Sequence, residues 1–192
     1  MLSKSIIVNI LQIIKNVGKV YNLFKYIVGI VTFLTQDQKQ NKGNLKIKIV
    51  LFMFRFAQLA NKHLAIAILL CVYLSFYHVF VEWFLGIELP RKTKVGKGLI
   101  IYHGQALVIN QGVQIGNYCI LRNSTTIGHK ILTDGSLSAC PIIGNYVDVG
   151  ANVCIIGSIT IGNNVKIGAG SVVVKSVPNN CTVVGNPAKI IA

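Results

Sequence analysis

The four histidines are the side chains of this sequence best suited to move a proton near neutral pH. One of them, His103, interrupts an aliphatic run, GLIIYHGQALVIN, and is followed directly by a glycine. A hydroxyl group that attacks an acyl group must lose its proton, and a positioned imidazole is the usual base for that step. His103 is therefore the first candidate for catalysis, and we expect Gly104 to leave room beside it for a substrate.

His129 and Cys140 are the competing candidates. Both lie in TIGHKILTDGSLSACP, a stretch that interrupts the repeat described below, and such excursions often carry substrate contacts. A cysteine can carry an acyl group, but no basic residue adjoins Cys140 in the sequence to favour its thiolate. We interpret Cys140 as a residue that lines a cleft. His63 and His78 fall in an apolar region and are predicted to be structural.

From Val95 onward the sequence repeats with a period of six residues. Hexads that begin at an aliphatic residue include VGKGLI at 95, IYHGQA at 101, IGNYCI at 115 and LRNSTT at 121. After the non-repeating stretch, six hexads follow one another without a slip, from IGNYVD at 143 to VVKSVP at 173. Such repeats are typical of solenoids, in which each coil contacts only its neighbours.

The first and fifth positions of each hexad are predicted to point inward. Aliphatic residues occupy the first position and smaller apolar or hydroxyl residues the fifth, while Gly and Asn permit the bends between short strands. His103 falls at the third position of its hexad, so it should project outward while Ile101 and Leu107 belong to the core. The alternative, an antiparallel sandwich of short strands, would not require a fixed six-residue phase.

Three segments are more specific than the hexads, namely IYHG at 101, CPIIG at 140 and VVGNPAKI at 183. With the hexads they resemble the hexapeptide-repeat acyltransferases, and more narrowly the serine O-acetyltransferase-like branch of capsule and exopolysaccharide (colanic-acid-type) biosynthesis. The resemblance covers residues 36–192. It implies a mainly β fold, a left-handed parallel β-helix preceded by an α-helical N-terminal region, and an acetyl-CoA-dependent O-acetyltransferase that uses no metal.

The resemblance also implies a catalytic pair and a trimer. In this family the catalytic histidine lies in an H-G or H-A segment at a groove between adjacent subunits of a trimer, and a carboxylate upstream is its partner. Here the histidine would be His103 and the carboxylate Glu88, in GIELP, where serine acetyltransferases typically have Asp. Such a carboxylate would hold the tautomer of the imidazole and stabilise the imidazolium.

For the acetyl donor, the resemblance points to small residues at the turns of the coils. Ala151 in VGAN and Ala169 in IGAG match the positions where the pantetheine arm passes close to the backbone in this family. Lys175 and Lys189 are candidates to meet the phosphates of the nucleotide. The alternatives are tight packing of the coils for the alanines and a solvated face for the lysines.

The sequence departs from the serine acetyltransferases at one point. Those enzymes have an Arg-His pair before the proline that corresponds to Pro141, and the arginine meets the carboxylate of serine, whereas this chain has Ala139 and Cys140. The acceptor is therefore predicted to be a neutral sugar hydroxyl. Five residues are the candidates to contact this saccharide: Tyr102, Gln105, Asn110, His129 and Cys140.

The first half of the chain is basic and apolar. The formal net charge is +14, and residues 1–94 carry 13 of the 19 basic side chains but only 3 of the 5 acidic ones. Residues 45–87 are predicted to be helical, and 64–81 contain no Lys, Arg, Asp or Glu, which is close to the lower limit for a membrane span. A helix pair associated with an anionic membrane surface is one interpretation. No motif for nucleic acid is present, so nucleic acid is not expected as a partner.

We expect two domains, a helical region at 1–87 and an acetyltransferase β-helix at 88–192 with an inserted loop at 129–142. Five cysteines without CxxC spacing predict free thiols in a reducing cytoplasm, and the apolar N-terminal stretch does not resemble a signal peptide. The expected location is therefore the cytoplasm, at or near the inner face of the membrane. Two other functions stay open: serine acetylation in cysteine biosynthesis, and a non-catalytic hexapeptide-repeat scaffold.

Overall fold

The computed structural model describes the backbone of residues 4–192 and the side chains from Gly18 onward. The chain divides into two compact units, residues 1–35 and residues 36–192. The described part of the first unit is one helix, α1 (Lys4–Thr35). Residues 1–3 of the predicted helical region lie outside the described backbone. All the strands and the remaining helices belong to the second unit.

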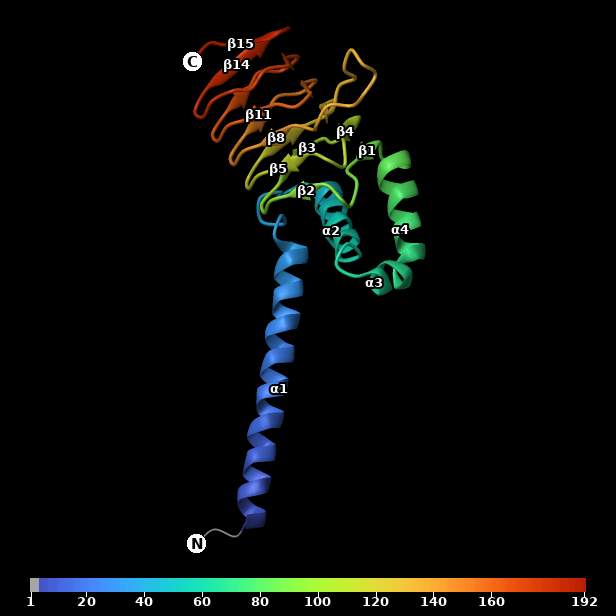
Figure 1. Cartoon of the computed structure of the whole chain (residues 1–192), viewed down its shortest axis with the longest axis vertical. Coiled ribbons are helices and arrows are strands. Elements are labelled where there is room, and N and C mark those ends of the chain that lie inside the picture. Colours follow the sequence, from blue (N-terminus) through green and yellow to red (C-terminus); the bar gives the residue numbers. More distant parts are fainter. Residues whose placement is uncertain (1–3) are drawn as a thin grey trace. The chain divides into compact units, whose positions relative to one another are not determined.

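The second unit contains a parallel β-solenoid built from three sheets, in which successive coils each add a short strand to a sheet (Figure 1). After β13, the last coil meets sheet B through an isolated bridge between Val177 and Ile161. Sheet A contains β1 (Ile87–Glu88), β4 (Leu107–Ile109), β7 (Thr126–Gly128), β10 (Cys154–Ile156) and β13 (Val172–Val173). Sheet B contains β2 (Lys94–Val95), β5 (Gln114–Ile115), β8 (Ile142–Ile143) and β11 (Thr160–Ile161). Sheet C contains β3 (Ile100–Tyr102), β6 (Ile120–Arg122), β9 (Asp148–Val149), β12 (Lys166–Ile167) and β14 (Thr182–Gly185), and β15 (Ala188–Ile190) pairs antiparallel with β14.

The core is the aliphatic column that the hexads predict. First-position residues such as Ile101, Ile127 and Ile161 are buried, and so are fifth-position residues such as Val153 and Ser171. Because every coil presents the same two inward positions, the coils stack into one continuous core that no coil could form alone. The predicted solenoid with its helical N-terminal region is confirmed.

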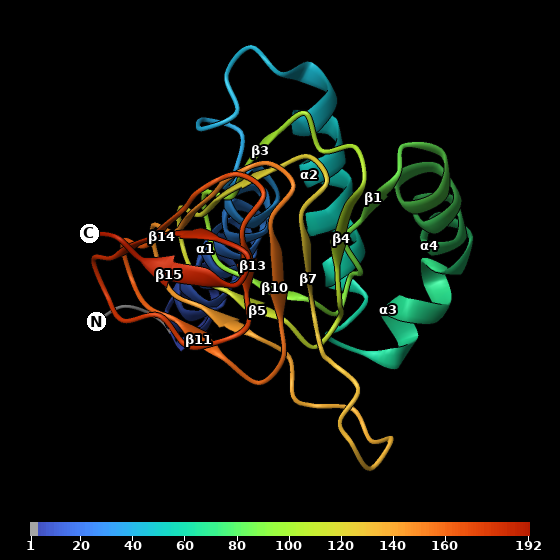
Figure 2. The ribbon, with the colours of Figure 1, turned by 90° about the horizontal axis from the view of Figure 1, so that it is seen from above.

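The interruption of the repeat is an excursion between sheets A and B. The chain leaves the solenoid after β7 and rejoins it at β8, and an isolated antiparallel bridge between Ile131 and Leu137 closes the loop on itself. Figure 2 shows this loop projecting beyond the coils, and its residues from Lys130 to Leu137 are exposed. The insertion therefore adds a wall beside sheet A without breaking the stacking of the coils.

The stretch 45–87 that is predicted to be helical contains α2 (Leu45–Leu59), α3 (Leu64–Leu69), α4 (Cys71–Tyr77) and the π-helical segment η1 (His78–Phe84). Its last residue, Ile87, instead lies in strand β1. Asn44 caps α2, because its side chain accepts a hydrogen bond from the backbone N–H of Ile47 at 3.1 Å. Among the residues that the structure describes, no helix is both long and apolar enough to cross a bilayer.

A polar clamp ties the helices to the first coil. The buried Asp37 and Arg55 form an ion pair at 2.7 Å, and Asp37 also accepts a hydrogen bond from the backbone N–H of Leu99. Arg55 donates to the carbonyls of Val95 and Gly96, and Asn41 bonds the carbonyl of Leu99. These side chains satisfy backbone groups that would otherwise lie unpaired at the start of the solenoid. The clamp explains why the unit begins near residue 36.

Candidate active site

His103 lies at the corner where the chain passes from sheet C to sheet A. The strand register places corresponding residues of successive coils above one another: Tyr102 pairs with Arg122, Ile120 with Asp148, and Asp148 with Lys166. In this register Tyr102, Arg122, Gly150 and Gly168 lie above one another. The residues that follow them, His103, Asn123, Ala151 and Ala169, therefore line up along one edge of the solenoid. We call this edge the His103 corner. The candidate base and both candidate alanines therefore share one corner.

The turn at His103 explains its direction and corrects one expectation. His103 and Gly104 both have positive φ, 68° and 72°, which turns the chain so that the imidazole is exposed. A Cβ on Gly104 would lie 3.0 Å from Ile87 Cδ1 and 3.2 Å from Ile101 Cγ2. The expectation that Gly104 makes room for a substrate is wrong, because the space beside it is filled by the core. Glycine is required there for φ and for close packing.

Polar side chains surround the turn. Gln105 directs its amide nitrogen to the main-chain carbonyl of His103 and its amide oxygen to Lys46 Nζ, 3.1 Å away. The half-exposed Tyr102 has the guanidinium of Arg122 5.5 Å from its ring centre. Arg122, which was not predicted from the sequence, forms an ion pair with Asp148 and donates to the carbonyl of Val149 at 2.8 Å. The cation beside Tyr102 is thus already paired.

A groove of about 400 Å³ follows the outer face of sheet A on the other side of the strands. We call it the sheet A groove. Its lining includes Glu88 from β1, Val108 and Asn110 at β4, Thr126 from β7, His129 at the start of the inserted loop, and Ile156 from β10. Outward-facing strand positions of four successive coils therefore form its floor, and the insertion begins its wall.

Asn110 fixes the state of His129 within this groove. The Asn110 Oδ1 accepts a hydrogen bond from the backbone N–H of Gly112 at 2.9 Å and one from the Cys140 thiol at 3.3 Å. Its Nδ2 therefore faces the Nδ1 of His129, 3.0 Å away, and donates to it. A ring whose Nδ1 accepts this bond carries its proton on Nε2, so neither nitrogen of that tautomer is left to accept a further proton. A base for a hydroxyl proton is better supplied by His103.

Three predicted residues therefore meet in the sheet A groove or at its rim: Asn110, His129 and Cys140. Glu88 lines the same groove, beside Val108 on the neighbouring strand. Within the described part of the chain, no hydrogen bond or ion pair joins Glu88 to His103. The pairing of these two side chains stays a prediction.

The candidate alanines pack as consecutive steps of the His103 corner. The carbonyl of Ala151 accepts a hydrogen bond from the N–H of Gly170 at 2.9 Å, and a Cβ on Gly150 would lie only 2.5 Å from Ala169 N. Tight stacking thus accounts for Gly150, while Ala169 itself is exposed. The role of the two alanines in binding acetyl-CoA stays a prediction. The same holds for Lys175 and Lys189, which are exposed and do not line the sheet A groove.

A second groove, of about 470 Å³, continues the first one along the solenoid. The two share Ile156, and the second is lined by the inserted loop, including Lys130 and Ser138, and by Val174 of the next coil. Ile156 and Val174 could not be predicted as groove residues, because nothing in their hexads distinguishes an outward aliphatic residue at a groove from one at any other face. Together the two grooves form a furrow on the outer side of sheet A.

Four other side chains with reactive groups are buried, partly buried or paired: Cys119, Cys154, Tyr77 and His78. Burial raises the pKa of Cys119 and of Cys154, so neither thiol is an activated nucleophile. Burial also raises the pKa of Tyr77 well above its usual value, and its hydroxyl donates to the carbonyl of Leu89 at 2.7 Å. Of the histidines, His78 is paired with Glu82 on the same helical segment. These residues support the site and are poor candidates for its chemistry.

Comparison with known proteins gives a consistent result. No protein-family model matches the chain. The putative colanic acid biosynthesis acetyltransferase WcaB of Escherichia coli K12 is 37% identical over 161 residues, which are 82% of this chain and 98% of that protein. A serine acetyltransferase of Synechococcus elongatus is 41% identical over 106 residues, 55% of this chain and 43% of that protein.

Solved structures extend the likeness to the fold of the helical region. The soybean serine acetyltransferase apoenzyme superposes with a TM-score of 0.72 at 26% identity, over 88% of this chain and 72% of that chain. The serine acetyltransferase of Neisseria gonorrhoeae gives a TM-score of 0.70 at 29% identity, over 85% and 68%. The likeness to WcaB spans nearly the whole of that protein, whereas the Synechococcus match spans less than half of its length. The chain therefore belongs to the hexapeptide-repeat acetyltransferases of the WcaB and serine acetyltransferase type.

Proposed function

We propose that this acetyltransferase moves an acetyl group from acetyl-CoA to a hydroxyl group of a saccharide used in capsular or extracellular polysaccharide synthesis, with His103 as the general base. The observation that carries the proposal is the exposed imidazole of His103 at the head of a corner of small residues. The name of the Escherichia coli relative, which refers to colanic acid biosynthesis, supports a saccharide acceptor.

The chemistry assigned to His103 is a proton relay. A nitrogen of the neutral imidazole accepts the proton of the acceptor hydroxyl as its oxygen attacks the thioester carbonyl carbon. The tetrahedral intermediate then collapses, the carbon–sulfur bond breaks, and the imidazolium returns the proton to the departing thiolate. Glu88 would orient the imidazole and stabilise its charge if the two side chains meet in the assembled enzyme.

The groove supports a neutral acceptor better than serine. A site that selects free serine must pair its carboxylate, because a charge that leaves water unpaired loses its hydration. At the position of the serine acetyltransferase arginine this chain has Ala139, and the neighbouring Cys140 thiol is bonded to Asn110. Arg122, the cation beside Tyr102, is paired with Asp148. Asn110, Thr126 and His129 offer the uncharged donors and acceptors that sugar hydroxyls need.

A direct assay tests the choice of acceptor. Purified protein is mixed with acetyl-CoA and either L-serine or a capsular oligosaccharide, and the release of the CoA thiol is followed. We expect measurable transfer to the oligosaccharide and negligible transfer to serine. Turnover with serine at a typical metabolic rate, about 10 per second, would show that the chain is a serine acetyltransferase instead.

We also propose that the working unit is a homotrimer. In one chain His103 lies at one edge of sheet A, whereas Asn110, His129 and Cys140 lie along the other edge, and no hydrogen bond between the two sets is found in the described residues. A neighbouring copy that places its His103 corner against this groove would complete the site. Sedimentation of the detergent-solubilised protein should give three chains, and an active monomer would contradict the shared site.

The helices support association with a membrane surface. Five large side chains, spaced three or four residues apart along α3, α4 and η1, are between 51% and 79% exposed: Ile68, Val72, Phe76, Val79 and Trp83. We call them the apolar stripe. An exposed stripe of this kind beside basic residues is the pattern of a helix that lies in a membrane interface. Flotation with anionic vesicles should carry the protein upward, and neutral vesicles should carry less.

A further inference from the structure

A strongly basic pocket lies where the helices meet the first coil. It has a volume of about 630 Å³ and lies between the end of α2, the start of α3 and the segment that joins β1 to β2. Its lining includes Lys62, His63, Leu64, Arg91, Lys92 and Lys94. We call it the basic pocket. The basic charge of this half of the chain is evident in the sequence, but its clustering in one pocket is not.

No carboxylate balances this charge from within the pocket. The chain has only five Asp and Glu residues, and none of them lines the basic pocket. Glu82 lines an adjoining pocket that shares Arg91 and Lys92 with the basic pocket, and it is paired there with His78. Several cations at one concave surface without a carboxylate favour an anionic ligand with several oxygen atoms, such as a phosphate ester.

Arg91 is already held in place. Its Nη1 donates to the side-chain oxygen of Asn61, and the amide nitrogen of Asn61 donates to the Arg91 carbonyl at 2.7 Å. This reciprocal pair fixes the guanidinium between α2 and the first coil, so little side-chain entropy is lost when an anion binds. Lys92 and Lys94 are exposed beside it and can reach the same anion.

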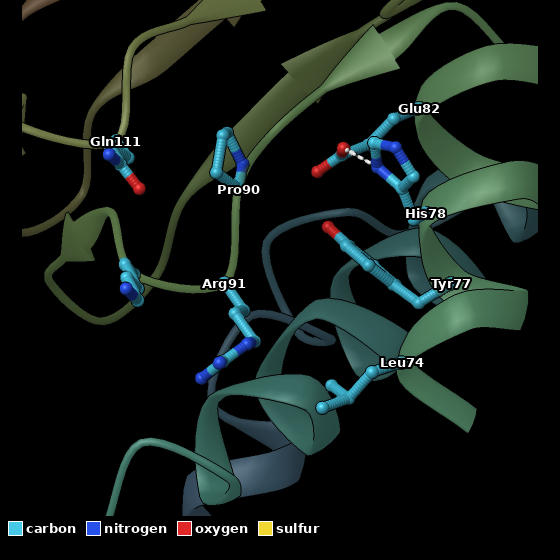
Figure 3. A pocket seen from close by; sticks show the side chains of 8 residues that line it. Leu74, Tyr77, His78, Glu82, Pro90, Arg91 and Gln111 are labelled. Carbon is cyan, nitrogen blue, oxygen red and sulfur yellow. Dashed lines mark hydrogen bonds and ion pairs between the residues drawn. The ribbon is translucent and has the colours of Figure 1, made fainter. Parts of the chain in front are cut away.

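The basic pocket is continuous with the sheet A groove. Between them lies a smaller pocket of about 240 Å³, shown in Figure 3, which shares Arg91 and Lys92 with the basic pocket. It shares Pro90 and Gln111 with the groove. In Figure 3 the Gln111 and Arg91 side chains lie on one side of this pocket, and the His78–Glu82 pair lies on the opposite side. A ligand that occupies the groove can therefore extend past Gln111 to the cations.

The basic pocket also adjoins the helix on which the apolar stripe begins. Leu64 and Ala67 of α3 line the pocket, and the stripe begins at Ile68 on the same helix. Three kinds of surface therefore adjoin one another here: a groove for uncharged polar groups, a set of cations, and exposed apolar side chains. A molecule that matches all three has a saccharide, a phosphate or diphosphate, and a lipid chain.

We propose that the basic pocket binds the phosphate groups of a lipid-linked saccharide, so that the acceptor is presented to the sheet A groove while still attached to its lipid carrier. This inference rests on the proposed function and names the class of its acceptor. A polymer that has already left its carrier would not use the cations that adjoin the groove and the apolar stripe.

Farnesyl diphosphate is a suitable probe, since it joins a diphosphate to a short isoprenoid chain. Binding to the full chain is measured by calorimetry, with inorganic pyrophosphate and farnesol as the two halves of the probe. The test variant is K92Q/K94Q, and the control K97Q/K166Q removes two exposed lysines outside the pocket. We expect the test variant to lose affinity by about tenfold or more, because the charge-assisted hydrogen bonds from two lysines to the diphosphate are lost. The control should stay within about twofold of the original protein, well under one such bond.

The remaining measurements separate this ligand from other anions. Pyrophosphate should bind more weakly than farnesyl diphosphate, and its affinity should also fall in the K92Q/K94Q variant. The affinity for farnesol, which has no phosphate, should be the same in this variant as in the original protein. Equal affinity of the two double variants for farnesyl diphosphate would overturn the proposal. So would a test variant that loses binding to phosphatidylglycerol vesicles but keeps farnesyl diphosphate, since the lysines would then serve the bilayer surface. The binding assay contains no acetyl-CoA, so it does not depend on acetyl transfer. A failure of the proposed acetyltransferase activity would therefore appear only in the transfer assay, and a failure of this inference only in the binding assay.

Discussion

Two corners of the solenoid have the same backbone but use their side chains differently. At the corner between sheets B and C, the side-chain oxygens of Asn117, Asn145, Asn163 and Asn179 each accept a backbone N–H from the preceding coil, at 2.7–3.0 Å. At the His103 corner, the stacked residues form no such ladder in the described chain. Both corners contain residues with positive φ, for example Tyr146 at the first and Asn152 at the second.

The difference teaches where chemistry can be placed on a repeat fold. An asparagine in the ladder is committed to the backbone of its neighbour, so it stabilises the stack and cannot serve a ligand. His103 and Ala169 are not committed in this way, so their identity is open to the needs of a substrate. Polar side chains that hold the stack should therefore change stability when replaced, and residues of the His103 corner should change activity.

The largest effect is expected at His103. The change His103→Ala should lower acetyl transfer by about two to four orders of magnitude, as expected for loss of a positioned general base. Its thermal unfolding should be unchanged, because the imidazole is exposed and makes no hydrogen bond to other described residues. Initial rates with a saccharide acceptor give the measurement, and acetyl-CoA binding should survive. If the variant transfers acetyl at a rate within about threefold of the original protein, the loss is far below that range. His103 would then not be the base, and His129 would be the next candidate.

The next largest effect is expected at the polar clamp, whose side chains bond the backbone of the first coil and so stabilise the stack. Asp37→Ala leaves the buried Arg55 without its carboxylate, and breaking such a pair costs about 3–5 kcal/mol of the free energy of unfolding. Urea unfolding at one protein concentration measures it. Asp148→Ala is the matched control, because its ion pair with Arg122 is partly exposed and should contribute about 1 kcal/mol or less. Equal losses in both variants would contradict a structural role specific to the clamp.

The same contrast shows what could be predicted from the sequence. The solenoid was predictable because the inward positions of a hexad are local and recur without a slip from Ile143 onward. The clamp was not, because Asp37 meets Leu99 across 62 positions of the chain and neither residue belongs to a repeating pattern. The role of Arg122 could not be predicted either, because its ion pair is with Asp148 of the neighbouring coil, 26 positions away in the chain.

The candidate site was predictable only in part. His103 could be selected because a titratable residue in an aliphatic hexad must face outward. The bond between Asn110 and His129 could not be predicted, since the inserted loop breaks the phase between β7 and β8 and hides which coil His129 would contact. The role of Gly104 was misjudged, because a sequence gives no sign of whether the space beside a glycine is solvent or core.

A smaller effect is expected within the asparagine ladder. Asn145→Ala removes the acceptor for Asn117 and leaves a half-buried N–H without its partner, which costs about 1–3 kcal/mol. Asn123→Ala at the His103 corner is the matched control. Its side chain makes only a long contact of 3.5 Å with Ser124, so stability should change by about 0.5 kcal/mol or less. If the control proves as destabilising as the ladder variant, the two corners are not different in the way described.

The smallest effect is expected at Ala169, where it decides between packing and ligand binding. Ala169 is exposed, so Ala169→Leu should leave the thermal midpoint unchanged. If the donor passes over this corner, the larger side chain should raise the KM for acetyl-CoA by about tenfold, the equivalent of a modest steric conflict. Ala169→Ser, which stays small, should keep the original KM. Steady-state rates at varied acetyl-CoA distinguish the cases. An unchanged KM in the leucine variant would show that acetyl-CoA does not bind over the His103 corner. The second groove, between the inserted loop and Val174, would then be the next candidate site for it.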